Sequence, residues 1–228
     1  MSEDIKSYLA ELIGTFALCF IGAGAVVMNS FTDGGVGLAG IALAHGLVLA
    51  IMVNATGHIS GGHINPAVTM GFIVTNRIKI SKGIAYMISQ LIGGVLGGFA
   101  LRAIFSPNVW STSNLGTPGL NAAVPFLNGV YIEAILTFFL VFTVFATAVD
   151  SRAPKSVYGF SIGLVLTFDI LMGGPLTGAS MNPARTFGPA VASGYFHNHL
   201  VYWIGPMVGG IVAALIYHHA LMPKSQNH

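Results

Sequence analysis

The sequence predicts an all-helical membrane protein with six membrane-spanning helices and two half-helices arranged as an inverted repeat. Of its 228 residues, 54% are hydrophobic and 7% are charged, whereas a soluble domain carries about 25% charged residues. A helix needs about 20 apolar residues to cross a bilayer. Segments of that kind recur along the chain, separated by loops rich in Gly, Pro, Ser or Asn. The six segments lie at about 7–29, 36–56, 83–105, 128–149, 156–176 and 199–222.

The inverted repeat rests on two pairs of similar segments. Ala10–Phe16 (AELIGTF) resembles Ile132–Phe138 (IEAILTF), and His63–Ala67 (HINPA) resembles Ser180–Ala184 (SMNPA). Each half holds three spans, so the second half must enter the membrane with the opposite orientation. We therefore expect one membrane channel domain over residues 1–228, with halves at about 1–105 and 128–228 joined by an outer loop at 106–127.

The basic residues of the loops predict the orientation. They cluster before the third span and between the fourth and fifth, whereas the loop at 106–127 has none. Because cytoplasmic loops are enriched in Lys and Arg, we expect both termini in the cytoplasm. The net charge of +2 is not gathered into a basic run, which argues against a nucleic-acid partner. The sequence leaves the plasma membrane and the vacuolar membrane open. The basic residues of these two loops are Arg77, Lys79, Lys82, Arg152 and Lys155.

Two Asn-Pro-Ala triplets, beginning at Asn65 and Asn182, mark the predicted half-helices. Asn favours the N-cap and Pro the first helical position. The apolar stretch after each triplet is about ten residues, half the length of a span. Two such half-helices from opposite faces bring their positive dipole ends together at mid-membrane. We expect each Asn amide to donate a hydrogen bond to a central water, a geometry that admits neutral solutes and excludes protons and cations.

The backbone before each triplet is predicted to be irregular at membrane depth, where carbonyl groups must be buried in protein or line a water-filled cavity. We expect these carbonyls to accept hydrogen bonds from a file of water. Glu11 and Glu133 occupy equivalent places in the repeat and are expected to hold the two loops in position by accepting their hydrogen bonds. The candidate carbonyls belong to Gly61, Gly62, His63, Ile64, Gly178, Ser180 and Met181.

Across nearly the whole chain these features resemble the aquaporin, or major intrinsic protein, family. Ser60–Thr69 and Gly178–Pro189 are similar to its two signature loops. The resemblance implies an aquaporin-like fold and a homotetramer in the lipid bilayer with one pore per subunit. It also implies a second constriction, nearer the non-cytoplasmic mouth. The corresponding positions here are His45, Ile170, Ala179 and Arg185, and their spacing from the two Asn residues matches the family.

The composition of this constriction predicts its cargo. Arg185 supplies fixed donors and a permanent charge, His45 a second polar wall, and Ile170 an apolar side. Such a filter resembles those of tonoplast intrinsic proteins or a microbial relative, and it favours water over glycerol. One departure is Asp169, where the related proteins tend to have Asn.

Other functions remain as alternatives. A mixed channel would also pass ammonia, urea or hydrogen peroxide. A secondary transporter, a less favoured reading, usually places acidic or ion-coordinating groups at its midplane site, where this chain has two neutral amides. We expect no enzyme, because no nucleophile or paired-acid constellation lies at the membrane centre. With a single cysteine, Cys19, and no Cys/His cluster, we expect neither a metal nor a cofactor.

Overall fold

The computed structural model describes residues 2–223 and forms helices and loops, with no strand among those residues. Six of its helices, 20 to 29 residues long, are long and apolar enough to span a membrane, which confirms the predicted fold class. Three of them contain a π-helical segment, at Leu18–Ala23, Phe145–Val149 and Tyr217–Leu221. The spans are α1 (Glu3–Ala17) continuing into α2 (Gly24–Phe31), α3 (Gly37–Ser60), α5 (Ile80–Ile104), α7 (Phe126–Val144), α8 (Tyr158–Thr177) and α10 (Val201–Ile216).

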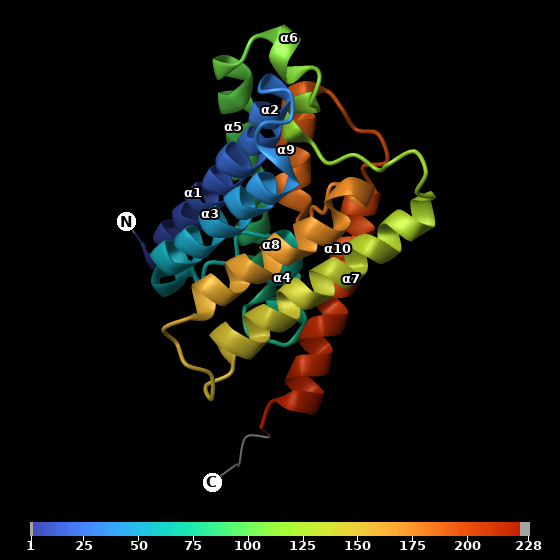
Figure 1. Cartoon of the computed structure of the whole chain (residues 1–228). Coiled ribbons are helices and arrows are strands. Elements are labelled where there is room, and N and C mark those ends of the chain that lie inside the picture. Colours follow the sequence, from blue (N-terminus) through green and yellow to red (C-terminus); the bar gives the residue numbers. More distant parts are fainter. Residues whose placement is uncertain (1, 224–228) are drawn as a thin grey trace.

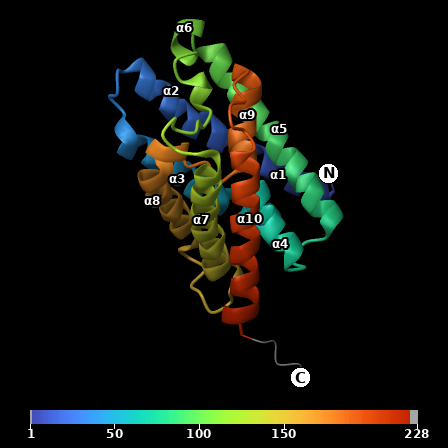
Figure 2. The same ribbon diagram turned by 90° about the vertical axis from the view of Figure 1, so that its right-hand side faces the viewer.

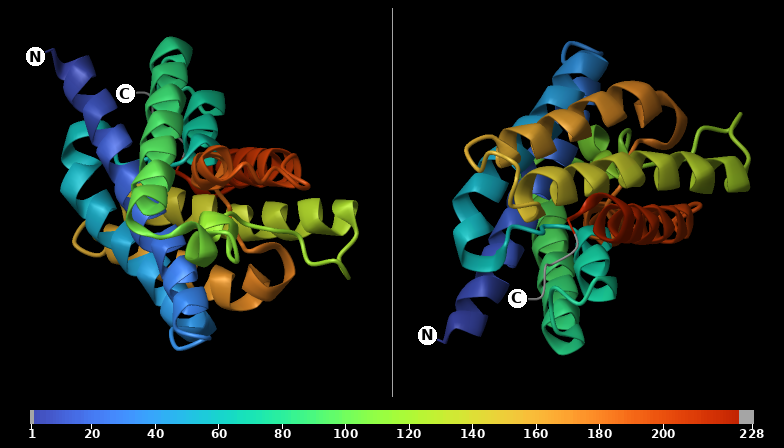
Figure 3. Two further views of the ribbon diagram at one scale, coloured as in Figure 1. Left: turned by 90° about the horizontal axis from the view of Figure 1, so that it is seen from above. Right: turned by 90° about the horizontal axis from the view of Figure 1, so that it is seen from below.

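The spans surround the two half-helices. In the order α5, α1, α3, α8, α7, α10, each span packs against the next, and the view from above shows this arrangement (Figure 3). The half-helices, α4 (Pro66–Val74) and α9 (Pro183–Ser193), complete the ring by packing against α5 and α10. They lie toward opposite ends of the molecule, with α9 near the end that carries α6 (Figures 1 and 2). This is the arrangement expected of an inverted repeat.

Each half-helix begins where the sequence predicts, at its Asn. The Oδ1 atom of Asn65 accepts a hydrogen bond from the backbone N–H of Ala67 at 2.8 Å. Asn182 caps α9 in the same way through the N–H of Ala184, at 3.0 Å. The side-chain oxygen therefore satisfies a free N–H at the helix start, and this bond also fixes the direction of the amide nitrogen.

Glycines lock each half-helix onto the last span of the other half. A Cβ atom at Gly94 of α5 would lie 2.5 Å from the carbonyl oxygen of Ala184 in α9. The matching contact joins Gly210 of α10 to Ala67 in α4, where the distance would be 2.8 Å. Small residues allow such close helix crossings in membranes. The two halves are therefore interlocked around the molecular centre.

The surface and interior have the polarity expected in lipid. Large apolar side chains are exposed along the spans, among them Ile51 (64%) and Leu127 (70%), whereas the carboxyl groups of Glu11 and Glu133 are fully buried. Because lipid provides no water to solvate charges, these two carboxyl groups lie inside the bundle and not on its lipid-facing surface.

The connection between α5 and α7 folds back toward the interior. It contains the short helix α6 (Pro107–Trp110) and a 3-10 turn, Asn114–Gly116. Leu115 and Gly116 both have positive φ angles, 54° and 68°, and both are buried. This turn places the Gly116 carbonyl beside Arg185, one of the side chains that line the central cavity.

Candidate functional site

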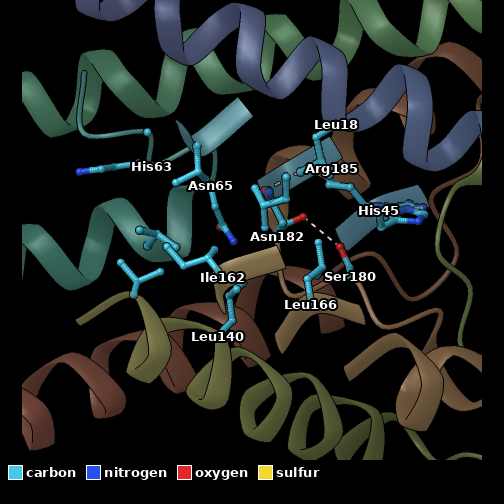
Figure 4. A pocket seen from close by; sticks show the side chains of 15 residues that line it. Leu18, His45, His63, Asn65, Leu140, Ile162, Leu166, Ser180, Asn182 and Arg185 are labelled. Atoms are coloured by element: carbon cyan, nitrogen blue, oxygen red, sulfur yellow. Dashed lines mark hydrogen bonds between the residues drawn. The ribbon is translucent and has the colours of Figure 1, made fainter. Parts of the chain in front are cut away.

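A narrow cavity runs through the centre of the molecule between the two halves. It offers about 20 Å³ to the centres of water molecules, little more than the roughly 10–15 Å³ that one water requires. One wall is apolar, and includes Leu18, Leu140, Ile162 and Leu166. Figure 4 shows the order of the polar side chains along the cavity, from His63 through Asn65 and Asn182 to Arg185 and His45.

The two Asn side chains meet at the middle of this cavity and exchange hydrogen bonds with the opposite loop. Asn65 Nδ2 donates to the carbonyl of Met181 at 2.8 Å, and Asn182 Nδ2 donates to the carbonyl of Ile64 at 2.9 Å. An amide nitrogen carries two N–H groups. Since both side chains line the cavity, the second N–H of each remains for a solute.

These contacts differ from the sequence expectation for Ile64 and Met181. Their carbonyls were expected to face a file of water, but they accept hydrogen bonds from the Asn amides and neither residue lines the cavity. Gly62, His63 and Ser180 do line it. Each Asn side chain is held in one orientation by its bond to the opposite loop and by its bond to the start of its own half-helix.

Gly61 and Gly178 lie at the C-terminal ends of two spans and not along the cavity. They end α3 and α8 with φ angles of 93° and 83°, and a left-handed residue is the usual helix terminator. Neither lines the cavity. They turn the chain from the span into the loop.

The loops are strained at equivalent places, just before each Asn. Ile64 and Met181 both have φ of 54°, a left-handed conformation that is a genuine outlier for a β-branched residue such as Ile. Such strain costs of order 1–3 kcal/mol per residue and persists only where the surroundings hold it. The buried carboxylates supply that hold.

Glu11 accepts hydrogen bonds from the first loop at both of its oxygens. The backbone N–H groups of His63 and Ile64 donate at 2.9 and 2.6 Å, and the hydroxyl of Ser60 donates at 2.6 Å. Gln90 Nε2 adds a fourth bond at 2.7 Å.

Glu133 does the same for the second loop. It accepts from the N–H groups of Ser180 and Met181 at 3.0 and 2.7 Å, and from the hydroxyl of Thr177 at 2.7 Å. The counterpart of Gln90 in this half is Pro206, which has no donor. The second carboxylate is therefore held by one bond fewer.

Two buried tyrosines that sequence reasoning missed complete these supports. The hydroxyl of Tyr86 donates to the carbonyl of Ser60 at 2.9 Å, and that of Tyr202 donates to the carbonyl of Thr177 at 2.7 Å. The two tyrosines occupy equivalent places in the third and sixth spans: Tyr86 lies 26 residues after its acceptor and Tyr202 lies 25 after its own. Extending the repeat into these spans would have identified them as a pair.

Arg185 and His45 form the polar end of the cavity. Arg185 donates from Nε and Nη2 to His45 Nε2, at 3.2 and 2.9 Å. The other ring nitrogen of His45, Nδ1, lies 2.8 Å from the carbonyl of Ile41. A carbonyl only accepts, so Nδ1 carries the proton and the imidazole is neutral. Arg185 Nη1 donates to the carbonyl of Gly116 at 2.8 Å, a contact that the sequence did not reveal.

Arg185 lines the cavity and makes no direct ion pair within the described part of the chain. No carboxylate forms an ion pair with it among residues 2–223, and its side chain is buried beside the cavity. Of the four residues expected at this constriction, His45 and Arg185 line the cavity. Ile170 and Ala179 are buried but are not among its lining residues.

The π-helical turn in the first span makes room for His45. A Cβ atom at Gly22 would lie 2.5 Å from Cδ2 of the His45 ring. Leu18, in the same turn, forms part of the apolar wall. Apolar periodicity does not distinguish a π turn from an α turn, so no pattern in the chain predicted this fit.

His63 lies at the opposite end of the cavity. Its Nδ1 is 3.1 Å from the hydroxyl of Thr69, and its ring lies 4.2 Å from that of Phe72, measured between centroids. Among residues 2–223, no group of three His, Cys, Asp or Glu side chains is placed to hold a metal ion.

Comparison with known proteins agrees with this geometry. The sequence model of the family described as Major intrinsic protein matches residues 1–217. This chain belongs to the major intrinsic protein family. Relatives in this family include Aquaporin TIP4-4 of Zea mays, 44% identical over 228 residues, with 96% of this chain and 88% of the relative covered. Aquaporin TIP2-1 of Arabidopsis thaliana is 40% identical, with 98% of this chain and 90% of the relative covered.

A solved structure shares the fold. The aquaglyceroporin from Plasmodium falciparum superposes with a TM-score of 0.84, covering 95% of this chain and 96% of that one at 24% identity. The predicted family is thereby confirmed, including its likeness to tonoplast intrinsic proteins. Members of this family are channels, so the prediction that the chain is not an enzyme is also confirmed.

Proposed function

We propose that this major intrinsic protein is a passive water channel that excludes protons and other ions. The observation that carries the proposal is the meeting of Asn65 and Asn182 in a cavity whose volume, about 20 Å³, is little more than one water molecule requires. Each amide keeps one N–H for the cavity because its other N–H binds the opposite loop. The pore then offers two fixed donors at its centre and apolar side chains opposite them.

This pair explains conduction without proton transfer. A water molecule that accepts a hydrogen bond from each Asn uses both of its lone pairs, so it has no site left for an incoming proton. Its own hydrogens point away from the centre toward both mouths. The positive ends of α4 and α9 meet at the same place and repel cations.

The outer constriction selects for small solutes. The contact between Arg185 and His45 closes one side of the cavity, and we place Ile170 and Ala179 on the remaining sides. Water fits this opening best. Ammonia, urea and hydrogen peroxide are the alternative cargoes, and the experiment below measures them together with water.

We further propose a single domain over residues 1–228, with halves at about 1–105 and 128–228, that forms a homotetramer in the bilayer with both termini in the cytoplasm. The orientation is supported by two basic loops that meet the end of the sixth span. Arg77 Nη2 lies 3.4 Å from His218 Nδ1, and Arg152 donates to the carbonyl of Leu221 at 2.9 Å. Residues 1 and 224–228 lie outside the described part of the chain. Chemical cross-linking in lipid, resolved on denaturing gels, tests the tetramer.

Osmotic shrinkage of proteoliposomes tests the water channel. We expect vesicles with this protein to shrink much faster than empty ones, and Leu166→Trp, which fills the cavity wall, to abolish the difference. Leu164→Trp is the matched control, because Leu164 is on the outer surface of the same helix. Equal rates with and without folded wild-type protein would refute the proposal. Uptake of urea, ammonia and hydrogen peroxide in the same vesicles defines the cargo.

A further inference from the structure

Asp169 in α8 is a buried acid that neither the pore nor the loop supports account for. Its side chain is 1% exposed, and its Oδ2 atom is buried without a hydrogen-bond partner. Glu11 and Glu133, by contrast, accept hydrogen bonds at both oxygens. Nearly all buried polar groups are hydrogen-bonded, and an acid inside a membrane marks a functional site by default.

The position of Asp169 places it beside the outer constriction. Ile162 and Leu166 line the cavity, and Asp169 follows them by seven and three residues, on the same face of the helix. One turn further along, Gly173 contacts the constriction loop, since a Cβ atom there would lie 3.3 Å from Cβ of Ala179. Asp169 is not itself a lining residue, so the carboxyl lies behind the cavity wall, close to where α8 reaches that loop.

The charged groups around Asp169 leave the region close to neutral without it. α8 packs against α3 and α7. Glu133 is the buried titratable group of α7, and His45, neutral in its bonding pattern, is the titratable group of α3 at the cavity. The other α3 histidine, His58, is exposed near the far end of that helix. From α9, Arg185 contributes the positive charge. When Glu133 is ionised, its negative charge balances the positive charge of Arg185.

We propose that Asp169 is a further selectivity residue whose ionisation decides whether the outer constriction repels monovalent cations. The inference rests on the proposed channel function. When the carboxyl is neutral, the charge of Arg185 and the two helix dipoles form the barrier. When it is ionised, a negative charge in a medium of low dielectric constant opposes that barrier.

Sodium uptake and water permeability, measured on the same proteoliposomes, test this inference. Wild type, Asp169→Asn and the control Asp33→Asn, which changes an exposed turn, are compared from about pH 5 to about pH 9. Because higher pH favours the ionised carboxyl, sodium uptake per wild-type channel should rise about tenfold, the effect of ~1.4 kcal/mol on a barrier. The Asp33→Asn channel should follow wild type.

The Asp169→Asn channel should keep its water permeability and show low sodium uptake at every pH. A pH-dependent rise that persists in Asp169→Asn would overturn the proposal, as would a wild-type uptake that does not change with pH. The second result needs only the wild-type protein, so it stands if the variant fails to fold. Failure of the water-channel proposal is a separate outcome, because it appears as wild-type vesicles that shrink no faster than empty ones.

Discussion

At the scale of single residues, the outer constriction depends on how His45 is held. Its Nδ1 atom is tied to the carbonyl of Ile41 in its own helix, so Nε2 faces Arg185 as an acceptor. The ring also fills the space left by Gly22. We therefore expect selectivity to depend on this hydrogen-bonded pair and on a glycine that is not among the cavity-lining residues.

Removing the imidazole should widen the constriction. In His45→Ala, Arg185 loses two acceptor contacts and the cavity gains the volume of the ring, so the uptake of urea and glycerol should rise relative to water. An increase of about tenfold corresponds to ~1.4 kcal/mol off the barrier. Light scattering with each solute measures the ratio. His58→Ala, on the exposed side of the same helix, should keep the wild-type ratio, and an unchanged ratio in His45→Ala would assign His45 to packing alone.

A methyl group at Gly22 should act on the same pair from behind. The Cβ atom of Gly22→Ala would overlap the His45 ring, at 2.5 Å from Cδ2, so the ring must move relative to Arg185. We expect an altered ratio of water to urea permeability in a protein that still folds. Gly24→Ala is the control, because its Cβ meets only a methyl group of Leu101 at 3.2 Å. Equal ratios in both variants would show that the π turn does not position His45.

At the scale of elements, each half-helix is held at its N-terminal end. Carboxylates and tyrosines hold the loop before each one, and glycine contacts hold its first turn against a span of the other half. Half-helices of 9 and 11 residues are too short to be stable alone in water. Tertiary contacts therefore supply the stability that their length does not.

Disturbing one of the glycine contacts should weaken the whole assembly. In Gly94→Ala the new methyl group would meet the Ala184 carbonyl at 2.5 Å, and a backbone atom cannot rotate away. Overpacking of this kind costs about 1–3 kcal/mol, which lowers the melting temperature by roughly 2–4 °C per kcal/mol in a protein of this size. Thermal unfolding in detergent measures the loss. Gly119→Ala, whose Cβ would have its nearest neighbour at 3.5 Å, should melt like wild type; an equal melting temperature for Gly94→Ala would show that the crossing tolerates a methyl group.

At the scale of the whole molecule, a cluster around Asp150 ties the loop between α7 and α8 to the end of the sixth span. Asp150 accepts hydrogen bonds from Arg152 Nε at 3.0 Å and from the hydroxyl of Tyr217 at 3.0 Å. Lys155 donates to the carbonyl of Asp150 at 2.9 Å. The hydrogen bonds from the Arg152 side chain hold the pKa of Asp150 well below its ordinary range. Helices from both ends of the second half thus meet at one carboxylate.

The stability from this cluster should disappear in acid. Because the pKa of Asp150 is lower in the folded than in the unfolded chain, its contribution is present above the unfolded value, about 3.9, and is lost as the pH falls through the folded one. The difference in melting temperature between wild type and Asp150→Asn should be constant above about pH 5 and shrink below about pH 4. Asp4→Asn, at an exposed ion pair, controls for acid effects elsewhere. A difference that persists unchanged in strong acid would place the stability outside this carboxylate.

The number of spans, the inverted repeat and the two half-helices could be predicted from the amino-acid sequence alone. They follow from the length of the apolar runs, from the recurrence of two pairs of similar segments, and from the N-cap and first-turn preferences of Asn and Pro. His45 and Arg185, which together form one polar end of the cavity, were also named from the sequence, through the resemblance to the family and their spacing from the two Asn residues. These properties depend on residues that are close in the chain or on positions that repeat.

The contacts between side chains of the two halves became visible only in the folded structure. The exchange of bonds between Asn65 and the Met181 carbonyl joins residues 116 positions apart, and the contact of Arg185 with Gly116 spans 69. The fit of Gly22 to His45 and the isolation of Asp169 arise in the same way. Hydrogen bonding and close packing depend on distances and directions between elements, and no local pattern in the chain encodes them.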